Sequence, residues 1–413
     1  MTRAETTNQR PGKSVLISGA GIVGSTLARW LLARGFTPAL VEQAPQFRTG
    51  GYIIDFWGVG FDVAERMGLI PALRAAGYVN DRIVFVRADG SVRSCFGGAA
   101  LRRALGDRFL SIRRGDLALE IWRGLAERAE VIFGDSIASL DETPDGVDVT
   151  FESGRRRSFE LVVGADGLRS VVRRHAFGDT PDAEQYLGYC AAAFATGGYA
   201  RRDEHTYLSY AAPGRQISRF ALRNDGTGFL LVFAWPADPK ALPRDMASQK
   251  KLLIAQFRDE PWMERSEILS RLEASDDLYF DAVSQIHIPR WSKGRVALVG
   301  DAAYCPSLLA GEGSVFAVAG AYILAGELDR AAGDFARAFC SYEQSFKPFI
   351  EHKQKAARAF ISSFTPRTAA GLFVRDIVLK LGAVPAIADL LMRHFVADRF
   401  QLPDYPAPAQ RIF

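Results

Sequence analysis

Cysteine and histidine are both scarce in this chain of 413 residues, which has four cysteines and five histidines. The cysteines Cys95, Cys190, Cys305 and Cys340 stand far apart, without the short spacings of metal-binding or redox motifs. The histidines have no ligand spacing either, so the sequence predicts neither a metal centre nor a disulfide framework. A GxSxG motif is also absent, which excludes the nucleophile elbow of the α/β-hydrolases.

Long apolar runs and a strong charge of one sign are missing as well. No apolar run reaches the roughly 20 residues that a membrane-spanning helix needs. The formal net charge is only +4, and the one tight basic run, residues 155–157, falls in a predicted hairpin turn. We therefore expect a cytoplasmic protein with no signal peptide, no stable membrane insertion and no nucleic-acid partner.

Residues 14–43 combine a short apolar strand, a glycine-rich turn, a helix and a second strand. Gly19, Gly21 and Gly24 have GxGxxG spacing, which allows a tight turn, close approach of a pyrophosphate and close helix packing. The free N–H groups at the start of the helix favour a phosphate. Glu42 ends the second strand, where a carboxylate would accept hydrogen bonds from an adenosine ribose and repel a 2′-phosphate. The pattern predicts a bound dinucleotide; the alternative is a glycine-rich turn in an ordinary α/β protein.

Two further acidic residues stand where an apolar strand ends in a glycine turn. Asp166 does so in LVVGADGLRSVVRR, and Asp301 does so in GRVALVGDAAYCP. The carboxyl ends of parallel strands form the ligand-binding edge of an open sheet, so both are candidate ligand residues. Gly311 and Gly313 then open a long apolar helix and could cradle another part of the same ligand. A structural helix cap at Asp301 would fit the pattern as well.

The middle of the chain has a different pattern. Residues 180–288 are rich in Tyr, Phe and Gly and alternate in polarity, which predicts an antiparallel sheet. Residues 83–96 alternate around an Asp-Gly turn that is typical of a hairpin. The apolar stripe from Phe229 to Trp235 is more typical of a core than of a binding site. Residues 244–272 are interpreted as a helical insertion.

In this order and at these separations, GAGIVG, GADGLRSVVR and GDAAYCP resemble the motifs of the flavoprotein aromatic hydroxylases. These are the single-component FAD monooxygenases with a para-hydroxybenzoate-hydroxylase-type fold. The resemblance implies that the glycine turn binds the adenosine pyrophosphate of FAD, and that Asp301 hydrogen-bonds the ribityl chain. It also implies that Asp166 lies near both the FAD pyrophosphate and the pyridine nucleotide. Arg114 takes the position of the family's FAD-binding arginine at a helix start.

Within that family the chain is most similar to the compact type that inactivates tetracyclines and tailors polyketides. Arg48 and Asp55 have the mutual spacing of an arginine proposed to meet NADPH and an aspartate that meets FAD, so the resemblance implies these roles. Two positions depart from the family. Tyr304 stands where histidine often follows GDAA, and Glu312 replaces the glutamine of GQG. A carboxylate beside the flavin ring would disfavour the anionic reduced flavin, unless it points to solvent.

The resemblance implies an α/β fold with a Rossmann-like FAD-binding domain, an antiparallel-sheet substrate domain and a C-terminal helical segment. The length suits two domains with a helical appendage. We expect the FAD-binding domain over residues 14–80, 101–178 and 289–330, the substrate domain over 81–100 and 179–288, and the helices over 331–413.

The implied activity is hydroxylation of a phenolic or polycyclic aromatic small molecule with FAD, NAD(P)H and O₂, through a C4a-hydroperoxyflavin. The cofactor carries the chemistry, so no residue is assigned as catalytic. NAD(P)H would bind transiently, because the sequence has no second GxGxxG turn. Two alternatives stay open. One is a flavin-dependent halogenase, disfavoured by the lack of a WxWxIP motif; the other is a non-catalytic flavoprotein that sequesters a hydrophobic ligand. The sequence leaves the oligomeric state open.

Overall fold

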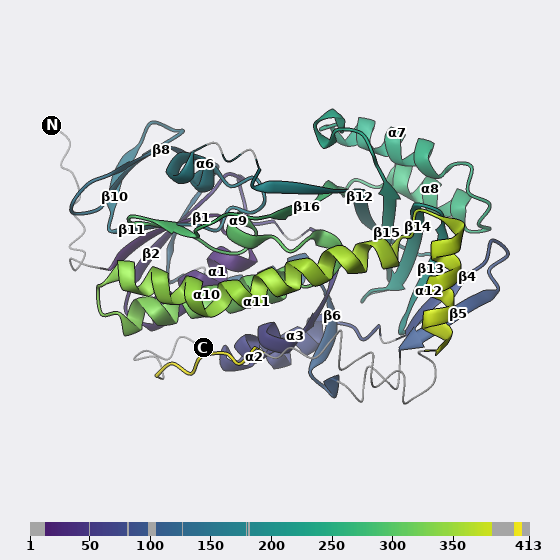
Figure 1. Ribbon diagram of the computed structural model, residues 1–413, viewed down its shortest axis with the longest axis horizontal. Coiled ribbons are helices and arrows are strands. Elements are labelled where there is room, and N and C mark those ends of the chain that lie inside the picture. The colour runs from purple at the N-terminus through teal and green to yellow at the C-terminus, as the bar shows by residue number, and fades with distance from the viewer. Residues whose placement is uncertain are drawn as a thin grey trace.

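The structure is a computed structural model in which two parts lie side by side along the long axis (Figure 1). A parallel sheet forms one part and a larger, mainly antiparallel sheet forms the other, and the helix α11 (Phe335–Phe364) runs past both. The structure describes residues 13–48, 50–80, 82–97, 105–125, 127–178, 180, 182–381 and 400–406.

The six-stranded sheet is centred on β1, which pairs in parallel with β2 on one side and β11 on the other. All its pairings are parallel except the one between β17 and β18. Its strands are buried on both faces, which explains their short, continuous apolar runs. In order across the sheet they are β17 (Ser292–Lys293), β18 (Val296–Leu298), β11 (Leu161–Gly164), β1 (Ser14–Ser18), β2 (Thr37–Glu42) and β7 (Glu130–Phe133).

The helix α1 (Ile22–Ala33) follows β1 and packs against α10 (Gly313–Arg330), which in turn packs against α11. Every residue of α10 from Val315 to Leu328 is buried, because neighbours surround the helix. This explains why the sequence there is apolar without a polar face. The other elements of this part are α5 (Arg114–Arg123), α6 (Val171–Phe177), α9 (Asp301–Tyr304) and the small sheet of β8 (Ile137–Glu142), β9 (Val147–Phe151) and β10 (Arg156–Phe159).

A two-stranded ribbon of β3 (Ile53–Trp57) and β6 (Phe109–Arg113) stands beside this part. The helices α2 (Gly58–Arg66) and α3 (Ile70–Ala76) follow β3 in the chain, and α2 packs against α10.

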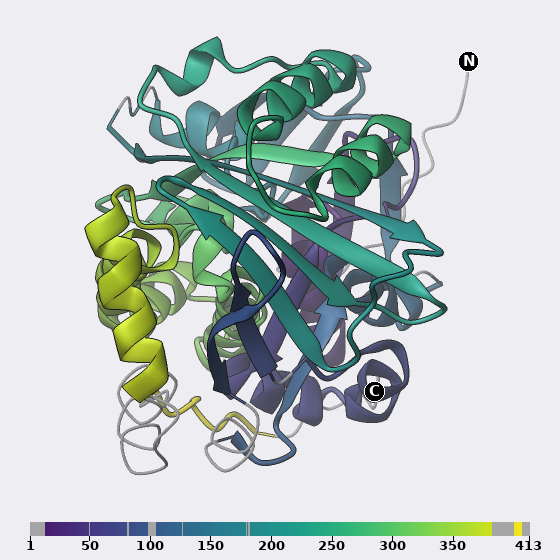
Figure 2. The same ribbon diagram turned by 90° about the vertical axis from the view of Figure 1, so that its right-hand side faces the viewer.

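The seven-stranded sheet is antiparallel except for the parallel pairing of β13 with β4. Figure 2 shows this sheet in front, with α7 (Met246–Phe257) and α8 (Arg265–Ala274) on its outer side. Phe229 and Phe233 are fully buried in the core beneath these helices, which confirms the core interpretation of that stripe. In order across the sheet the strands are β16 (Tyr279–Ile286), β12 (Glu184–Gly197), β15 (Gly226–Ala234), β14 (Arg215–Ala221), β13 (Thr206–Ala212), β4 (Arg82–Val86) and β5 (Val92–Gly97).

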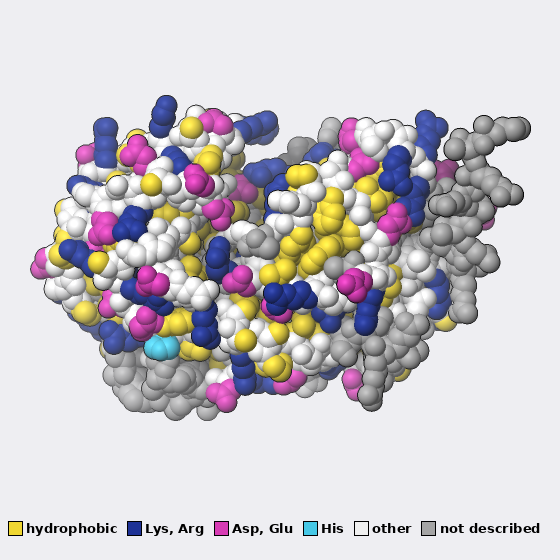
Figure 3. Space-filling model, turned by 180° about the vertical axis from the view of Figure 1, so that it is seen from behind, with side chains coloured by type: hydrophobic (Ala, Val, Ile, Leu, Met, Phe, Trp, Pro, Cys, Tyr) yellow, Lys and Arg dark blue, Asp and Glu magenta, His cyan; other side chains and the backbone are white. Residues whose placement is uncertain are grey.

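The structure confirms the expected α/β fold with a Rossmann-like part, an antiparallel sheet and C-terminal helices, and it refines two elements. The helical insertion is two helices, because the segment between Phe257 and Arg265 leaves the helical path. The C-terminal helix α12 (Ala369–Leu381) packs on the second sheet through Leu372, Arg375 and Asp376, beside β5. The exact domain boundaries stay a prediction. On the back face, basic and acidic side chains are interspersed without a large patch of one sign (Figure 3).

Candidate active site

The predicted motifs meet at one edge of the six-stranded sheet. Because β1, β2, β11 and β18 are parallel, their carboxyl ends lie at the same edge. The glycine turn follows β1, Glu42 ends β2, Asp166 follows β11 and Asp301 follows β18. The fold therefore brings together four segments that are far apart in the sequence.

The three glycines of the turn have different reasons to be glycine. Gly19 has a φ of +101°, and a Cβ on it would lie 2.6 Å from the carbonyl oxygen of Ala165. A Cβ on Gly24 would overlap the Gly19 carbonyl oxygen, so close backbone packing requires both glycines. Gly21 is the N-cap of α1, and nothing lies within 4 Å of the position its Cβ would take. This open space beside the first N–H groups of α1 fits a phosphate group.

Glu42 is held against the glycine turn. Its Oε2 accepts a hydrogen bond from the Ala20 N–H at 3.0 Å, and its Oε1 accepts one from the Ala44 N–H at 2.9 Å. A carboxylate oxygen has room for a second donor, so the group could still accept from a ribose hydroxyl.

Asp166 caps a helix and keeps one oxygen without a partner. Its Oδ2 accepts from the N–H groups of Val171 and Val172, at 2.8 and 3.1 Å, and from the Ser18 hydroxyl at 3.2 Å. Its Oδ1 is buried and has no hydrogen-bond partner among the described residues. A buried acceptor without a donor is costly, so the arrangement suits a ligand that supplies one.

Asp301 lies at the start of α9 and beside the start of α10. A Cβ on Gly313 would lie 3.8 Å from its Oδ1, and Gly311 has a φ of +72° with nothing within 4 Å of its Cβ position. Burial raises the pKa of the Asp301 carboxyl above its usual range, and the guanidinium of Arg114 opposes the rise. Arg114 begins α5, where its N–H donates to the Tyr52 carbonyl oxygen at 2.9 Å. Asp301, Arg114 and the two glycines thus form one cluster.

This cluster faces the inner side of the seven-stranded sheet. The rings of Tyr52 and Tyr279 lie 4.9 Å apart, centroid to centroid, and burial raises the pKa of both phenols. Arg169, three residues after Asp166, forms an ion pair with Asp281 of β16 at 2.6 Å. The candidate site therefore lies where the two parts of the molecule meet.

Asp55 also lies at this junction. On β3 it accepts a hydrogen bond of 2.6 Å from the Ser111 hydroxyl on β6. Burial raises its pKa to about 6, although Ser111 opposes the rise. The Asp55 charge acts on Tyr207 of the sheet's inner face, so the two side chains are near each other. Arg48 has an exposed side chain, and no hydrogen bond or ion pair to a described residue holds it against this group.

The two departures from the family pattern have different structural settings. Tyr304 is buried, with its ring 4.4 Å from that of Trp291, and its hydroxyl accepts a hydrogen bond from Tyr342 at 3.2 Å. It therefore belongs to the core. Glu312 pairs with Lys353 of α11, with 2.7 Å between Oε1 and Nζ. The Glu312 carboxylate is therefore offset by a cation of the fold and not by solvent.

Two residues that the sequence analysis did not single out hold the motifs in place. Arg173 is buried and donates to the carbonyl oxygens of Leu168 at 2.6 Å and Ala302 at 2.8 Å, which links the turn after β11 to α9. Gln354 of α11 donates to the Cys305 carbonyl oxygen at 3.1 Å. Arg173 stands within the GADGLRSVVR motif and could have been noticed; nothing in the sequence around Gln354 indicates its role.

A family model described as an FAD binding domain matches residues 13–338. The chain belongs to this family of flavin-dependent monooxygenases. A flavin-dependent monooxygenase of Legionella longbeachae serogroup 1 (strain NSW150) is 34% identical over 351 residues, which cover 83% of this chain and 87% of the relative. The FAD-dependent monooxygenase asL4 of Sarocladium schorii is 30% identical over 427 residues, which cover 96% of this chain and 99% of the relative.

Solved structures agree with this assignment. The tetracycline destructase Tet(55) superimposes with a TM-score of 0.80 at 32% identity, covering 96% of this chain and 99% of that one. Klebsiella pneumoniae HpxO, complexed with FAD and uric acid, superimposes with a TM-score of 0.78 at 22% identity, covering 92% and 97%. The second likeness concerns the fold alone.

Membership of this flavin-dependent monooxygenase family confirms the resemblance and makes FAD the cofactor. Within the described residues, no helix is both long and apolar enough to cross a membrane. The roles of the individual residues stay predictions, and the arrangement of Gly21, Glu42, Arg114, Asp166 and Asp301 around one sheet edge fits them.

Proposed function

We propose that this flavin-dependent monooxygenase uses NAD(P)H and O₂ to hydroxylate a phenolic or polycyclic aromatic small molecule. The observation that supports the proposal is the contact of Tyr52 with Tyr279, beside Asp301 and Arg114, where the FAD-binding part meets the inner face of the second sheet. Bound FAD would supply the redox chemistry, which takes electrons from NAD(P)H and passes one oxygen atom of O₂ to the ring.

The protein's own task is to hold FAD at this junction. The start of α1 at Gly21 would take the pyrophosphate, and Glu42 would take the adenosine ribose. Asp301 would accept from the ribityl chain, and Arg114 would balance its charge. The unpartnered Oδ1 of Asp166 would accept from a water that also donates to the pyrophosphate, because the pyrophosphate itself has no donor.

The inner face of the seven-stranded sheet would receive the substrate. Tyr207 and Phe220 stack there with their ring centroids 5.4 Å apart, which offers a flat apolar surface to an aromatic ring. Gln216, four residues before Phe220 on the same face of β14, is fully buried, and its Oε1 has no hydrogen-bond partner among the described residues. A phenolic hydroxyl could donate to this oxygen. With a pKa near 6, Asp55 could take up a phenolic proton at neutral pH.

Arg48 would serve the transient co-substrate. Its guanidinium is exposed and is not committed to a described residue, so it can contact a nucleotide that binds and leaves. Arginine suits this role because its charge persists at every physiological pH and its fork binds phosphate.

The test is a screen of aromatic compounds for stimulated NADPH and NADH consumption by FAD-saturated protein, with mass spectrometry for a gain of one oxygen. Tetracycline belongs in the screen because Tet(55), a tetracycline destructase, is 32% identical. Stimulation together with an oxygenated product supports the proposal. Tight binding of aromatic ligands without any nucleotide oxidation would instead indicate the non-catalytic flavoprotein, and a halogenated product in the presence of chloride or bromide would indicate the halogenase.

A further inference from the structure

A cavity of about 450 Å³ lies on the outer face of the seven-stranded sheet. Side chains alternate between the two faces of a strand, so Leu208 points into this cavity while its neighbour Tyr207 points to the inner face, near Asp55. The cavity is therefore separate from the candidate active site, with one layer of sheet between them. Its volume lies within the range of small-molecule sites.

The walls of this outer cavity are held in place by contacts within the protein. The hairpin that joins β4 to β5 reaches the segment before α8, where the Met263 N–H donates to the Ala88 carbonyl oxygen at 3.0 Å. A Cβ on Gly90, at the hairpin tip, would lie 2.8 Å from the Met263 sulfur. The hairpin and this segment thus close one side of the cavity, which is formed before any ligand binds.

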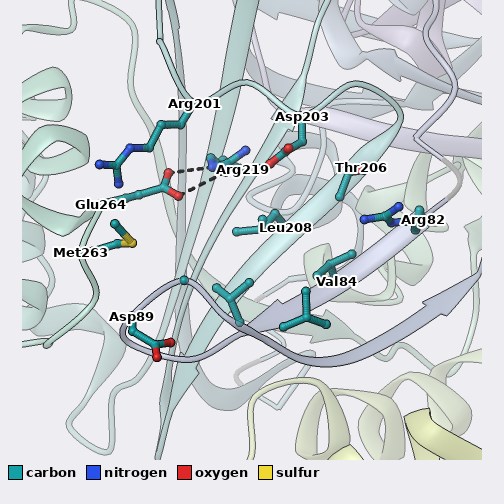
Figure 4. Close-up of a pocket in the computed structure, with 13 residues that line it drawn as sticks. Arg82, Val84, Asp89, Arg201, Asp203, Thr206, Leu208, Arg219, Met263 and Glu264 are labelled. Atoms are coloured by element: carbon teal, nitrogen blue, oxygen red, sulfur yellow. Dashed lines mark hydrogen bonds and ion pairs between the residues drawn. The ribbon is translucent and has the colours of Figure 1, made fainter.

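A buried ion pair forms another wall (Figure 4). Arg219 donates to both carboxylate oxygens of Glu264, at 2.7 and 3.2 Å, and the two side chains are 5% and 6% exposed. Arg219 also pairs with Asp203 at 2.8 Å, and the Tyr199 hydroxyl donates to Glu264 at 2.6 Å. Both carboxylates therefore have partners within the protein, although they share one guanidinium and the group keeps one net negative charge.

The third carboxylate of the lining is bonded as well. Asp89 accepts from the N–H and the hydroxyl of Ser91, at 2.9 and 2.7 Å, within its own turn. The two remaining charged groups are the guanidinium groups of Arg82 and Arg201. Neither has a side-chain hydrogen bond or ion pair to any residue in the described part of the chain. The charged hydrogen-bond donors that remain available to a ligand in this cavity are therefore these two guanidinium groups.

The floor between these arginines is apolar. Val84 and Val86 of β4 are 2% and 3% exposed, and Leu208 lies beside them on β13. Figure 4 shows Arg82 and Arg201 on opposite sides of this floor. Because both valines are already buried, an apolar body would gain contact mainly with the half-buried Leu208, and acidic groups would form charge-assisted hydrogen bonds with the arginines.

We propose that the outer cavity is a second binding site, distinct from the FAD and substrate sites, which takes a small organic anion with an apolar body. A carboxylate or sulfonate on an aromatic or aliphatic core has this chemistry. A cationic ligand would meet two unpaired guanidinium groups and only carboxylates that already have partners, so it is disfavoured.

The test uses naphthalene-2,6-disulfonate as the probe and isothermal titration calorimetry on FAD-saturated full-length protein. FAD and an excess of any substrate found in the screen keep the inner face filled. We expect one site with a dissociation constant between about 10 µM and 1 mM. Arg82→Gln and Arg201→Gln should each weaken binding roughly tenfold, as expected for loss of one charge-assisted hydrogen bond at a solvent-accessible site. Higher salt should weaken binding to the wild type and have less effect on the double variant.

Arg244→Gln is the matched control, because Arg244 is an exposed arginine of the same part of the chain outside the cavity lining. It should bind the probe as the wild type does. Arg82 and Arg201 are exposed, so their variants should keep the wild-type melting temperature and FAD affinity. The proposal is overturned if the wild type binds no probe up to about 10 mM, or if both arginine variants bind as tightly as Arg244→Gln.

Discussion

Replacing Lys353 by methionine would remove the ammonium group that pairs with the Glu312 carboxylate at the start of α10. The two side chains are 10% and 13% exposed and meet at 2.7 Å. Removing one partner of a buried pair costs about 3–5 kcal/mol. The positive end of the α10 dipole would still stabilise the carboxylate by about 0.3–1 kcal/mol. Because some solvent reaches both groups, we expect a loss of about 2–3 kcal/mol in the free energy of unfolding.

Urea denaturation of the FAD-free protein at neutral pH measures this loss. Glu312→Gln and the double variant complete a cycle that isolates the pair from the other contacts of each residue. The double variant should be more stable than Lys353→Met alone, because the carboxylate that loses the lysine in the single variant is also removed. Lys355→Met is the control, since Lys355 is exposed on the same helix and should change stability by less than about 0.5 kcal/mol. Additive single variants, or a loss below about 1 kcal/mol in Lys353→Met, would refute the reasoning.

The same variants test whether the pair acts on the flavin. The family resemblance places Glu312 near the flavin ring, so its unbalanced charge should lower the midpoint potential of bound FAD in Lys353→Met. Glu312→Gln should raise that potential, because it removes a negative charge beside the lysine. Midpoint potentials that match the wild type in both variants would show that the pair only supports the fold.

Three further predictions concern the cofactor and the inner face. Asp301→Ala should weaken FAD binding by roughly tenfold to a few hundredfold, because a charged acceptor is lost, and Asp301→Asn should weaken it less. FAD titration of the folded variants measures this, and wild-type affinity in Asp301→Ala would exclude Asp301 from FAD binding. Arg48→Ala should slow flavin reduction by NADPH with FAD saturating, which stopped-flow measures, whereas an unchanged rate would exclude Arg48 from the nucleotide site. Burial raises the pKa of Asp55 to about 6, above its unfolded value, so stability should fall as pH rises through about 4 to 6 in FAD-free protein. Asp55→Asn should flatten that part of the denaturation profile, and identical profiles would contradict the raised pKa.

The glycine turn and the strand-end acids of the FAD-binding part could be predicted from short stretches of the sequence. Gly19 and Gly24 are glycine because a Cβ would strike backbone atoms, and Gly21 leaves the open space at the start of α1. Glu42, Asp166 and Asp301 each end a strand or follow one, and parallel strands place such ends at one edge. These features depend on neighbours in the chain and on the direction of the strands, so spacing alone was enough to predict them.

Interactions between distant segments could not be read in this way. The family resemblance implied a carboxylate near the flavin at Glu312, and the packing of α10 against α11 then brought Lys353 to it. Tyr304 looked like a change in the active site, but its ring points into the core beside Trp291. The direction of the Tyr304 side chain depends on the path of α9, which the neighbouring residues in the sequence do not specify.

Short stretches of the sequence predicted a bound dinucleotide, the strand-end acids and the α/β fold, because glycine geometry and apolar periodicity are local properties. The resemblance to the flavoprotein hydroxylases implied that the dinucleotide is FAD. The pairing of charged side chains, in contrast, depends on how the strands are assembled. Glu264 and Asp203 share Arg219 as an ion-pair partner, whereas Arg82 and Arg201 face the outer cavity without a partner among the described residues. Charge balance depends on distances of a few ångströms between strands that are remote in the chain, and such distances exist only after the sheet has formed.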